Sequence, residues 1–270
     1  MPATSDRAAY LDAAYIIRNL EEANPLREPT LRSIIAALNL APGSRGLDIG
    51  CGIGLQALLL AEATSPGGAV TGLDISAELL AYARSRIKAS PLAERISFRE
   101  GDWRSLPFPD NTFDWVWSCD CVGYPSGDLL AALKEIVRVV RPGGRVAILA
   151  WTSQQLLAGY PLLEARLSKE ITKEASHFMC ALRSFSEAGL TEARAQTFIG
   201  EVQAPLSTEC RIALTSLFEM LWEAASPEAS EADRTDYQRL CQPNSSDFIL
   251  DLPEYYAFFT YTLFSGNVSK

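Results

Sequence analysis

The sequence has little histidine, no long apolar run and no large cluster of basic side chains. His177 is the only histidine among 270 residues. The longest apolar runs, such as 146–151, are far shorter than the roughly 18 residues that span a bilayer. Lys and Arg number 24 against 33 Asp and Glu, and the formal charge of −9 opposes tight binding to a polyanion. We therefore expect a soluble protein that has no membrane span and does not act on nucleic acid.

Signals for export and for several enzyme classes are also missing. The first twenty residues carry charges at Asp6, Arg7, Asp12 and Arg18, where a signal peptide would need an apolar stretch. A cytoplasmic location is therefore expected. The sequence contains no Gly-x-Ser-x-Gly and no Gly-Lys-Ser/Thr, which argues against a serine hydrolase and a phosphate-loop enzyme.

The six cysteines do not follow the spacing of a small disulfide-rich domain. Cys119 and Cys121 form a C-x-C pair, and Cys51 is expected nearby in the fold. A zinc site would need a second spaced pair, so we interpret these cysteines as small buried thiols and expect no metal.

Strand-like and helix-like segments alternate through the first half of the chain. "RGLDIG", "AVTGLD", "RISFRE", "FDWVWS" and "RVAILAW" have the composition of short buried strands. "LQALLLAEA", "AELLAYARSRIKA" and "GDLLAALKEIVRVV" have the pattern of helices, the second with Ser76 as its expected N-cap. This alternation predicts right-handed crossovers and a doubly wound α/β sheet.

Helical segments are expected before and after this region. Residues 7–22 and 29–39 read as two helices separated by the prolines of "NPLREP", so residues 1–40 are predicted to form a helical cap on a domain of residues 41–270. Helical insertions are expected at about 152–178 and, with an acidic composition, at 206–242. The second insertion separates the strands "TEARAQTFIGEV" and "YYAFFTYTLFSG", so it is expected to pack over one end of the sheet as a lid.

The first strand ends in a glycine-rich turn, "GLDIGCGIG". Gly50, Gly52 and Gly54 allow a tight turn and a close approach of backbone to a ligand, and the following helix offers its N-terminus to a negative group. In an open parallel sheet, ligands bind beyond the carboxyl ends of the strands. A dinucleotide and S-adenosylmethionine are the two ligands that use such a turn.

The details favour S-adenosylmethionine. In a dinucleotide turn the third glycine stands three places after the second, whereas Gly54 stands two places after Gly52. Asp48 suits an ammonium group better than a pyrophosphate. Asp74 and Asp102 follow the next two strands, where they can accept hydrogen bonds from ribose hydroxyls and from an adenine amino group.

Four segments, taken in order, resemble the motifs of class I S-adenosylmethionine-dependent methyltransferases. They are "LDIGCGIG", "GLDIS", "EGDWRSLPFPDNTFDWVWS" and "LKEIVRVVRPGGRVAIL", and they resemble most the branch that contains the ubiquinone and menaquinone methylases. The resemblance covers about residues 25–151 closely. It implies a Rossmann-like, mostly parallel seven-stranded sheet with an antiparallel last strand.

The resemblance also implies roles for individual residues. Asp48, Gly50, Cys51 and Gly52 would hold the methionine part of the cofactor, S-adenosyl-L-methionine, which leaves as S-adenosyl-L-homocysteine. Asp74 would bind the ribose. The adenine would lie between Ile75 and Trp103, with its amino group on Asp102, and the main chain of Cys119 would complete the pocket.

Three residues are candidates for a catalytic role at the acceptor. Asp120 follows the fourth strand where relatives usually have an apolar residue, and it reads either as a general base or substrate anchor or as an ordinary loop acid. Tyr124 takes the place of a histidine often seen in that loop and could orient a hydroxyl or simply pack. His177, in the first insertion, could approach the site or be a surface residue.

The sequence therefore predicts a methyltransferase that modifies oxygen or carbon, and less readily nitrogen, of a small apolar or aromatic molecule. Two alternatives remain at this point: a nicotinamide-dependent oxidoreductase on the same fold, and a non-catalytic S-adenosylmethionine-binding partner protein. The sequence does not indicate the oligomeric state.

Overall fold

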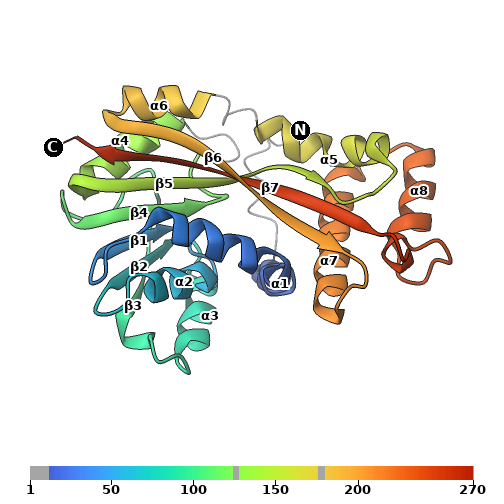
Figure 1. Ribbon diagram of the computed structural model, residues 1–270, viewed down its shortest axis with the longest axis horizontal. Coiled ribbons are helices and arrows are strands. Elements are labelled where there is room, and N and C mark those ends of the chain that lie inside the picture. Colours follow the sequence, from blue (N-terminus) through green and yellow to red (C-terminus); the bar gives the residue numbers. More distant parts are fainter. Residues whose placement is uncertain (1–11, 124–127, 176–179, 270) are drawn as a thin grey trace.

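The computed structural model describes residues 12–123, 128–175 and 180–269 and contains a seven-stranded sheet (Figure 1). The strand order is β3-β2-β1-β4-β5-β7-β6. The first five strands pair in parallel, and β7 runs antiparallel to both of its neighbours, β5 and β6. The predicted doubly wound sheet with an antiparallel last strand is confirmed. The strands are β1 (Arg45–Ile49), β2 (Ala69–Asp74), β3 (Ile96–Glu100), β4 (Phe113–Cys119), β5 (Val140–Gln155), β6 (Leu190–Gln203) and β7 (Tyr256–Val268).

Helices cover both faces of the sheet. Helices α2 (Leu55–Ala63) and α3 (Ala77–Ile87) lie on one face, and α4 (Leu129–Val139) and α6 (Ala181–Glu187) on the other (Figure 1). Apolar side chains from each set of helices pack in a separate buried cluster. Because both faces of the central strands are buried, these strands read as continuous apolar runs.

The start of α3 follows the sequence expectation. The Ser76 side chain accepts a hydrogen bond from Leu79 N at 3.2 Å, which caps the first turn. Glu78 lies in that turn, and Arg84 and Arg86 lie in the last turn, so the charges complement the helix dipole. The cap fixes the position at which the chain leaves β2.

The prediction of two N-terminal helices is wrong. A single helix, α1 (Ala13–Leu38), contains both Pro25 and Pro29. Each proline removes one helical hydrogen bond and its ring crowds the preceding turn, which bends a helix that tertiary packing holds together. Figure 1 shows α1 changing direction along its length. The C-terminal half buries Ile34 and Leu38 beside α2, and the bend directs the N-terminal half toward the carboxyl ends of the strands.

Strands β5, β7 and β6 are longer than predicted and extend past the rest of the sheet (Figure 1). The predicted helix after Trp151 does not begin until Pro161, because β5 continues to Gln155 along β7. Three helices surround the extension: α5 (Pro161–Ala175), α7 (Thr208–Ala225) and α8 (Glu231–Cys241). The acidic block of 206–242 is therefore two helices.

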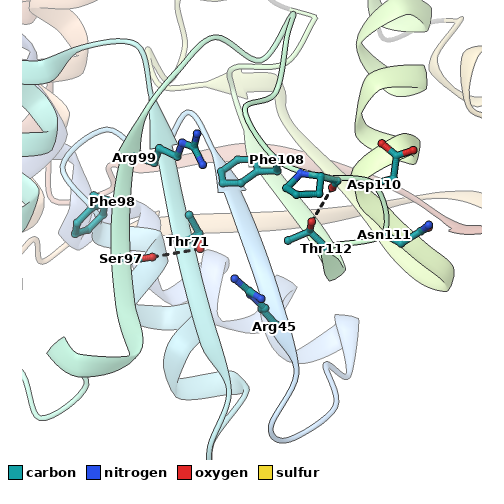
Figure 2. A pocket seen from close by; sticks show the side chains of 10 residues that line it. Arg45, Thr71, Ser97, Phe98, Arg99, Phe108, Asp110, Asn111 and Thr112 are labelled. Carbon is teal, nitrogen blue, oxygen red and sulfur yellow. Dashed lines mark hydrogen bonds between the residues drawn. The ribbon is translucent and has the colours of Figure 1, made fainter.

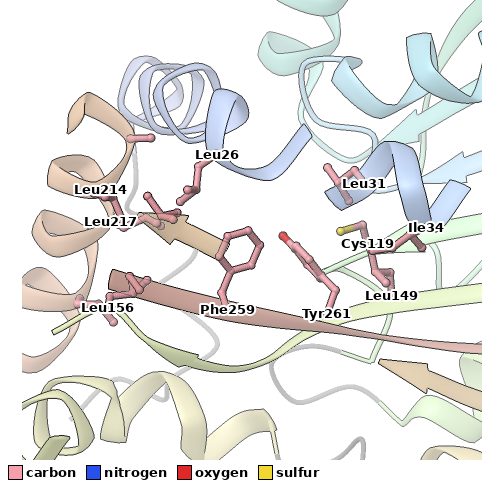
Figure 3. Packing of buried hydrophobic residues seen from close by; sticks show 14 of the residues in the cluster. Leu26, Leu31, Ile34, Cys119, Leu149, Leu156, Leu214, Leu217, Phe259 and Tyr261 are labelled. Atoms are coloured by element: carbon pink, nitrogen blue, oxygen red, sulfur yellow. The ribbon is translucent and has the colours of Figure 1, made fainter. Parts of the chain in front are cut away.

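A continuous apolar cluster joins these outer helices to the rest of the molecule. Figure 3 shows Leu26 of α1, Leu214 and Leu217 of α7, and Phe259 of β7 around one core. Phe259 is fully buried and pairs in register with Gly200 of β6, where a side chain would collide with its ring. The extension of the sheet is thus part of the main core.

Candidate functional site

The turn after β1 has the backbone that the glycines predict. Gly50, Gly52 and Gly54 all have positive φ, at 75°, 51° and 77°. A Cβ on Gly50 would lie 2.4 Å from Cys121 Sγ, so glycine is required there by space as well as by backbone angle. The turn leads directly into α2, whose first residue is Leu55.

The Asp74 carboxylate fixes this turn. Its Oδ2 accepts a hydrogen bond from Gly52 N at 2.8 Å, and its Oδ1 accepts one from Ser76 N at 3.0 Å. The same carboxylate therefore holds the glycine turn and the N-terminus of α3 together. Leu20 of α1 lies against the turn, 3.3 Å from the position that a Cβ on Gly52 would occupy.

Asp48 is the buried acid of the site. Its side chain is on β1 and the residue is only 2% exposed. Within residues 12–123, 128–169 and 180–269, its Oδ2 is the only buried side-chain oxygen or nitrogen without a hydrogen-bond partner. Burial, and secondarily the negative charge of Asp74, raises the pKa of Asp48 to about 8. A buried carboxyl group in this state suits a cationic ligand that would supply the missing partner.

The thiols around the turn are protonated. Burial is the main cause that raises the pKa of Cys51 and Cys119, and it raises the pKa of Cys121 to about 12. All three are free cysteines. Cys51 and Cys119 are buried, as the sequence predicts, whereas Cys121 is only partly buried. The Cys119 thiol also donates a hydrogen bond to Asp120 Oδ2 at 3.4 Å.

The two strands beyond β1 end in the residues expected at an adenine. Ile75 follows β2 and is 68% exposed, so its side chain is open to a ligand at this edge of the sheet. Trp103 is half-buried, and the Arg104 guanidinium lies 4.8 Å from the centre of its ring. Asp102 forms an ion pair with Arg104 at 3.0 Å and also accepts from Arg104 N.

The structure brings all nine predicted cofactor residues to one edge of the sheet. Strands β3, β2, β1 and β4 are parallel neighbours, so their carboxyl ends meet there. Cys119 is the last residue of β4 and is buried. The residues gathered at this edge are Asp48, Gly50, Cys51, Gly52, Asp74, Ile75, Asp102, Trp103 and Cys119.

Asp120, predicted as a base, an anchor or a loop acid, is fully engaged with neighbouring groups. Its backbone has a positive φ of 50°. Oδ1 accepts a hydrogen bond from Trp151 N at 2.7 Å, and Oδ2 accepts from Arg27 Nη2 at 2.8 Å and from Tyr261 Oη at 3.4 Å. The carboxylate therefore links the ends of β4 and β5 to α1 and β7.

Arg27 and Tyr261 are residues that the sequence interpretation missed. Arg27 is separated from Asp120 by 93 positions and from Tyr261 by 234, so no local pattern associates them. The only signal is a charged residue between the two prolines of α1. The other two catalytic candidates, Tyr124 and His177, lie outside the described residues.

The hollow drawn in Figure 2 is not part of this site. It has a volume of about 690 Å³ and lies against β1, β2 and β3 near the start of β4, away from the carboxyl ends of the strands. Figure 2 shows the Thr71 and Ser97 hydroxyls, 3.3 Å apart, on its floor. Its lining residues are Arg45, Thr71, Ser97, Phe98, Arg99, Phe108, Pro109, Asp110, Asn111 and Thr112.

The sheet order, the glycine turn and the strand-end acids define a class I S-adenosylmethionine-dependent methyltransferase. A methyltransferase-domain family model matches residues 47–144. A demethylmenaquinone methyltransferase of Bacillus cytotoxicus is 34% identical over 177 residues, which cover 64% of this chain and 70% of that protein. The chain belongs to this family of enzymes, in the menaquinone and ubiquinone methylase branch, and its cofactor is S-adenosyl-L-methionine.

A second relative shares a smaller part of its length, and a solved structure shares the fold over most of its length. The chain spans about half of a demethylmenaquinone methyltransferase of Geobacillus sp., with 38% identity over 137 residues, or 50% of this chain and 54% of that protein. A structure of a sarcosine dimethylglycine methyltransferase from Galdieria sulphuraria has a TM-score of 0.56 at 21% identity, covering 93% of this chain and 88% of that one. At this level of identity, the structural similarity shows a shared fold.

No helix in the described part of the chain combines the length and the hydropathy needed to cross a membrane.

Proposed function

We propose that this enzyme methylates a small aromatic acceptor of the quinone class at oxygen or carbon. The names of the demethylmenaquinone methyltransferases support the quinone class. An aromatic wall next to the ends of β4 and β5 supports an aromatic ring. Trp151, the partly exposed member of this wall, stacks on the buried Phe259 with ring centres 4.5 Å apart and planes at 11°. Tyr261 meets the same tryptophan edge-on at 5.3 Å.

The observation that carries the cofactor assignment is the unpartnered oxygen of Asp48 beneath the glycine turn. In our proposal the ligand ammonium group pairs with Asp48, beside Gly50, Cys51 and Gly52. Asp74 accepts from the ribose while it keeps its bonds to the turn. Ile75 and Trp103 cover the two faces of the adenine, Asp102 accepts from its amino group, and the main chain of Cys119 completes the site.

The chemistry requires alignment more than acid catalysis. When bound, the cofactor would supply a methyl group: the acceptor atom would bond to the methyl carbon as the methyl–sulfur bond breaks and a neutral thioether leaves, and any proton on the acceptor atom would pass to solvent. The chain contributes by holding the acceptor in line and by excluding water. Asp120 acts in this proposal as an anchor of the site, because its two oxygens already accept four hydrogen bonds. Roles for Tyr124 and His177 at the acceptor remain predictions.

The N-terminal segment 1–40 and the insertions at about 152–178 and 206–242 are proposed to enclose the acceptor. Contacts of α1 with α7 support this arrangement. Tyr15 donates a hydrogen bond to Glu223, and Ser216 donates one to Asn19 at 3.1 Å. In this proposal α7 is a wall of the acceptor pocket.

The proposal is tested by transfer of a labelled methyl group. The enzyme is incubated with S-adenosylmethionine carrying a ¹³C-methyl group and with a panel of reduced naphthoquinones, catechols, aliphatic amines and a short RNA. We expect label only in the hydroxylated aromatic compounds, with ¹³C NMR separating O-methyl from C-methyl products. Label in the amine or the RNA but in no aromatic compound would overturn the proposed acceptor class.

A further inference from the structure

Arg27 is held in a polar cluster at the acceptor side of the site. Its Nε donates to Tyr261 Oη at 2.6 Å, and its Nη2 donates to Asp120 Oδ2 at 2.8 Å. The guanidinium also lies over the Tyr261 ring, 5.6 Å from the ring centre. Two partners, Asp120 just after β4 and Tyr261 on β7, therefore fix a side chain that comes from α1.

One nitrogen of this guanidinium is not used by the cluster. Among the described residues, Nη1 has no hydrogen-bond partner, although the side chain as a whole is only 18% exposed. Nη1 is also not fully buried, because among the described residues Asp48 Oδ2 is the only buried side-chain nitrogen or oxygen that lacks a hydrogen-bond partner. Two N–H groups of a fixed cation are thus accessible from outside the cluster.

The cluster keeps Arg27 charged and Tyr261 neutral. Burial opposes the charge on Arg27, but Tyr261, Asp120 and Cys119 together raise its pKa above the ordinary value. Burial holds the pKa of Tyr261 well above its usual range, so its hydroxyl keeps the proton. Asp120 has further donors in Trp151 N and Tyr261 Oη, so Arg27 is not its only compensation.

The position of Nη1 suits an aromatic acceptor that carries a negatively charged oxygen. The same tyrosine that orients Arg27 is part of the aromatic wall with Trp151 and Phe259. Tyr261 and Phe259 are buried, so an acceptor ring would pack on the partly exposed Trp151, beside the Arg27–Tyr261 pair. A guanidinium pairs most strongly with an oxygen that carries negative charge, and this preference is enhanced where water is excluded.

We propose that Nη1 of Arg27 binds the oxyanion of the methyl acceptor, so the enzyme selects aromatic compounds with an acidic hydroxyl group and binds them ionised. This inference rests on the proposed function and specifies its substrate. The negative charge of the ionised acceptor is shared between the oxygen and the neighbouring ring carbon. These are the two kinds of atom that the proposed function names as methyl acceptors.

The test is a binding measurement without turnover. In the presence of S-adenosylhomocysteine at pH 7.5, calorimetry compares 2-hydroxy-1,4-naphthoquinone, an anion at this pH, with neutral 1-naphthol. We expect wild type to prefer the anion. Arg27→Met should weaken the affinity for the anion by about 10-fold or more, as for a lost charge-assisted hydrogen bond. Its affinity for 1-naphthol should stay within 2-fold of wild type, and its affinity for S-adenosylhomocysteine should be unchanged. Arg27→Lys should retain part of the preference.

Further variants separate ligand binding from support of the fold. Arg27→Met/Asp120→Asn removes both charges, so no unpaired carboxylate remains, and it should show the same selective loss. Arg18→Met, on the same helix and paired with Glu219 at 3.9 Å, is the matched control and should behave as wild type. The inference would be overturned if the Arg27 variants lost affinity for the anion and for 1-naphthol equally, or if wild type showed no preference for the anion. Selective anion binding without methyl transfer to any aromatic compound would instead overturn the proposed function alone.

Discussion

Asp48 is the carboxyl group of the site whose pKa is raised by its surroundings. Its pKa is raised to about 8 by burial and by Asp74, whereas an aspartate in an unfolded chain titrates near 4. Since this pKa is raised, its stabilising contribution is complete below about pH 4 and is lost as pH rises through about 8. At pH 7 the ligand-free protein therefore holds Asp48 mainly protonated.

Cofactor binding is accordingly expected to release a proton from Asp48. A ligand ammonium group beside the carboxyl group favours its ionised form and lowers its pKa. Calorimetric titration with S-adenosylmethionine at pH 7, in two buffers of different ionisation enthalpy, should report close to one proton released. Asp48→Asn should bind more weakly and release none. If the variant released as many protons as wild type, the pairing of Asp48 with the cofactor would be wrong.

The sequence predicted that the strand-end acids meet at one edge of the sheet, but it did not predict the cluster of Arg27, Asp120 and Tyr261, for a physical reason. Asp48 lies in β1, Asp74 ends β2 and Asp102 lies two residues after β3, and parallel strands bring their carboxyl ends together whatever the rest of the chain does. Arg27 and Tyr261 reach Asp120 only through the path of α1 and the pairing of β7. Local patterns contain no information about such a meeting.

At the scale of elements, α1 is the part of the fold that local rules described least well. Proline is a strong helix terminator in an isolated segment, so two helices were the reasonable expectation. Here the packing of Leu31 and Ile35 against the sheet-facing core, together with contacts from the N-terminal half, maintains the helix on both sides of the bend. The strands and crossover helices were predictable because their periodicity is local.

The N-terminal half of α1 is attached to the rim of the cofactor site. Glu21 accepts hydrogen bonds from Tyr82 Oη at 2.8 Å and Arg86 Nη1 at 2.9 Å, both on α3, while Leu20 lies on the glycine turn. Loosening this attachment is expected to let the cofactor leave faster. Glu21→Ala should raise the dissociation rate of S-adenosylhomocysteine by roughly 2- to 5-fold, as for an exposed ion pair worth up to about 1 kcal/mol.

Stopped-flow displacement followed by tryptophan fluorescence measures this rate. The matched control is Glu62→Ala, which removes the contact of α2 with Arg32 at the other end of α1. That pair is similarly exposed but is not attached to the N-terminal half, so its loss should leave the rate unchanged. Identical rates in Glu21→Ala and wild type would show that α1 does not restrain the bound cofactor.

At the scale of the whole molecule, the continuous core predicts cooperative unfolding. Phe259 of β7 is fully buried between side chains of α1 and α7, with Trp151 stacked on its ring. Phe259→Ala should lower the free energy of unfolding by about 3 to 5 kcal/mol through lost burial and the cavity left behind. It should do so in one transition, because the buried residues described for the outer helices belong to the same apolar cluster as those of α1 and β7.

Urea denaturation followed in parallel by far-UV circular dichroism and tryptophan fluorescence tests this expectation, since coincident curves indicate a single transition. Ile199→Ala, at an exposed position on the neighbouring strand β6, is the control and should change stability by no more than about 0.5 kcal/mol. Two separated transitions in wild type would contradict a shared core.

The joint core also limits how acceptor preference can be exchanged between relatives. Transplanting residues 206–242 from another methylase would replace Leu214 and Leu217 but leave Leu26 and Phe259, whose shapes match the original helix. A mismatched graft would leave holes or clashes beneath the acceptor itself. We therefore expect new specificity in this chain to come from coordinated substitutions across α1, β7 and α7, and wholesale cassette replacement to yield poorly folded hybrids.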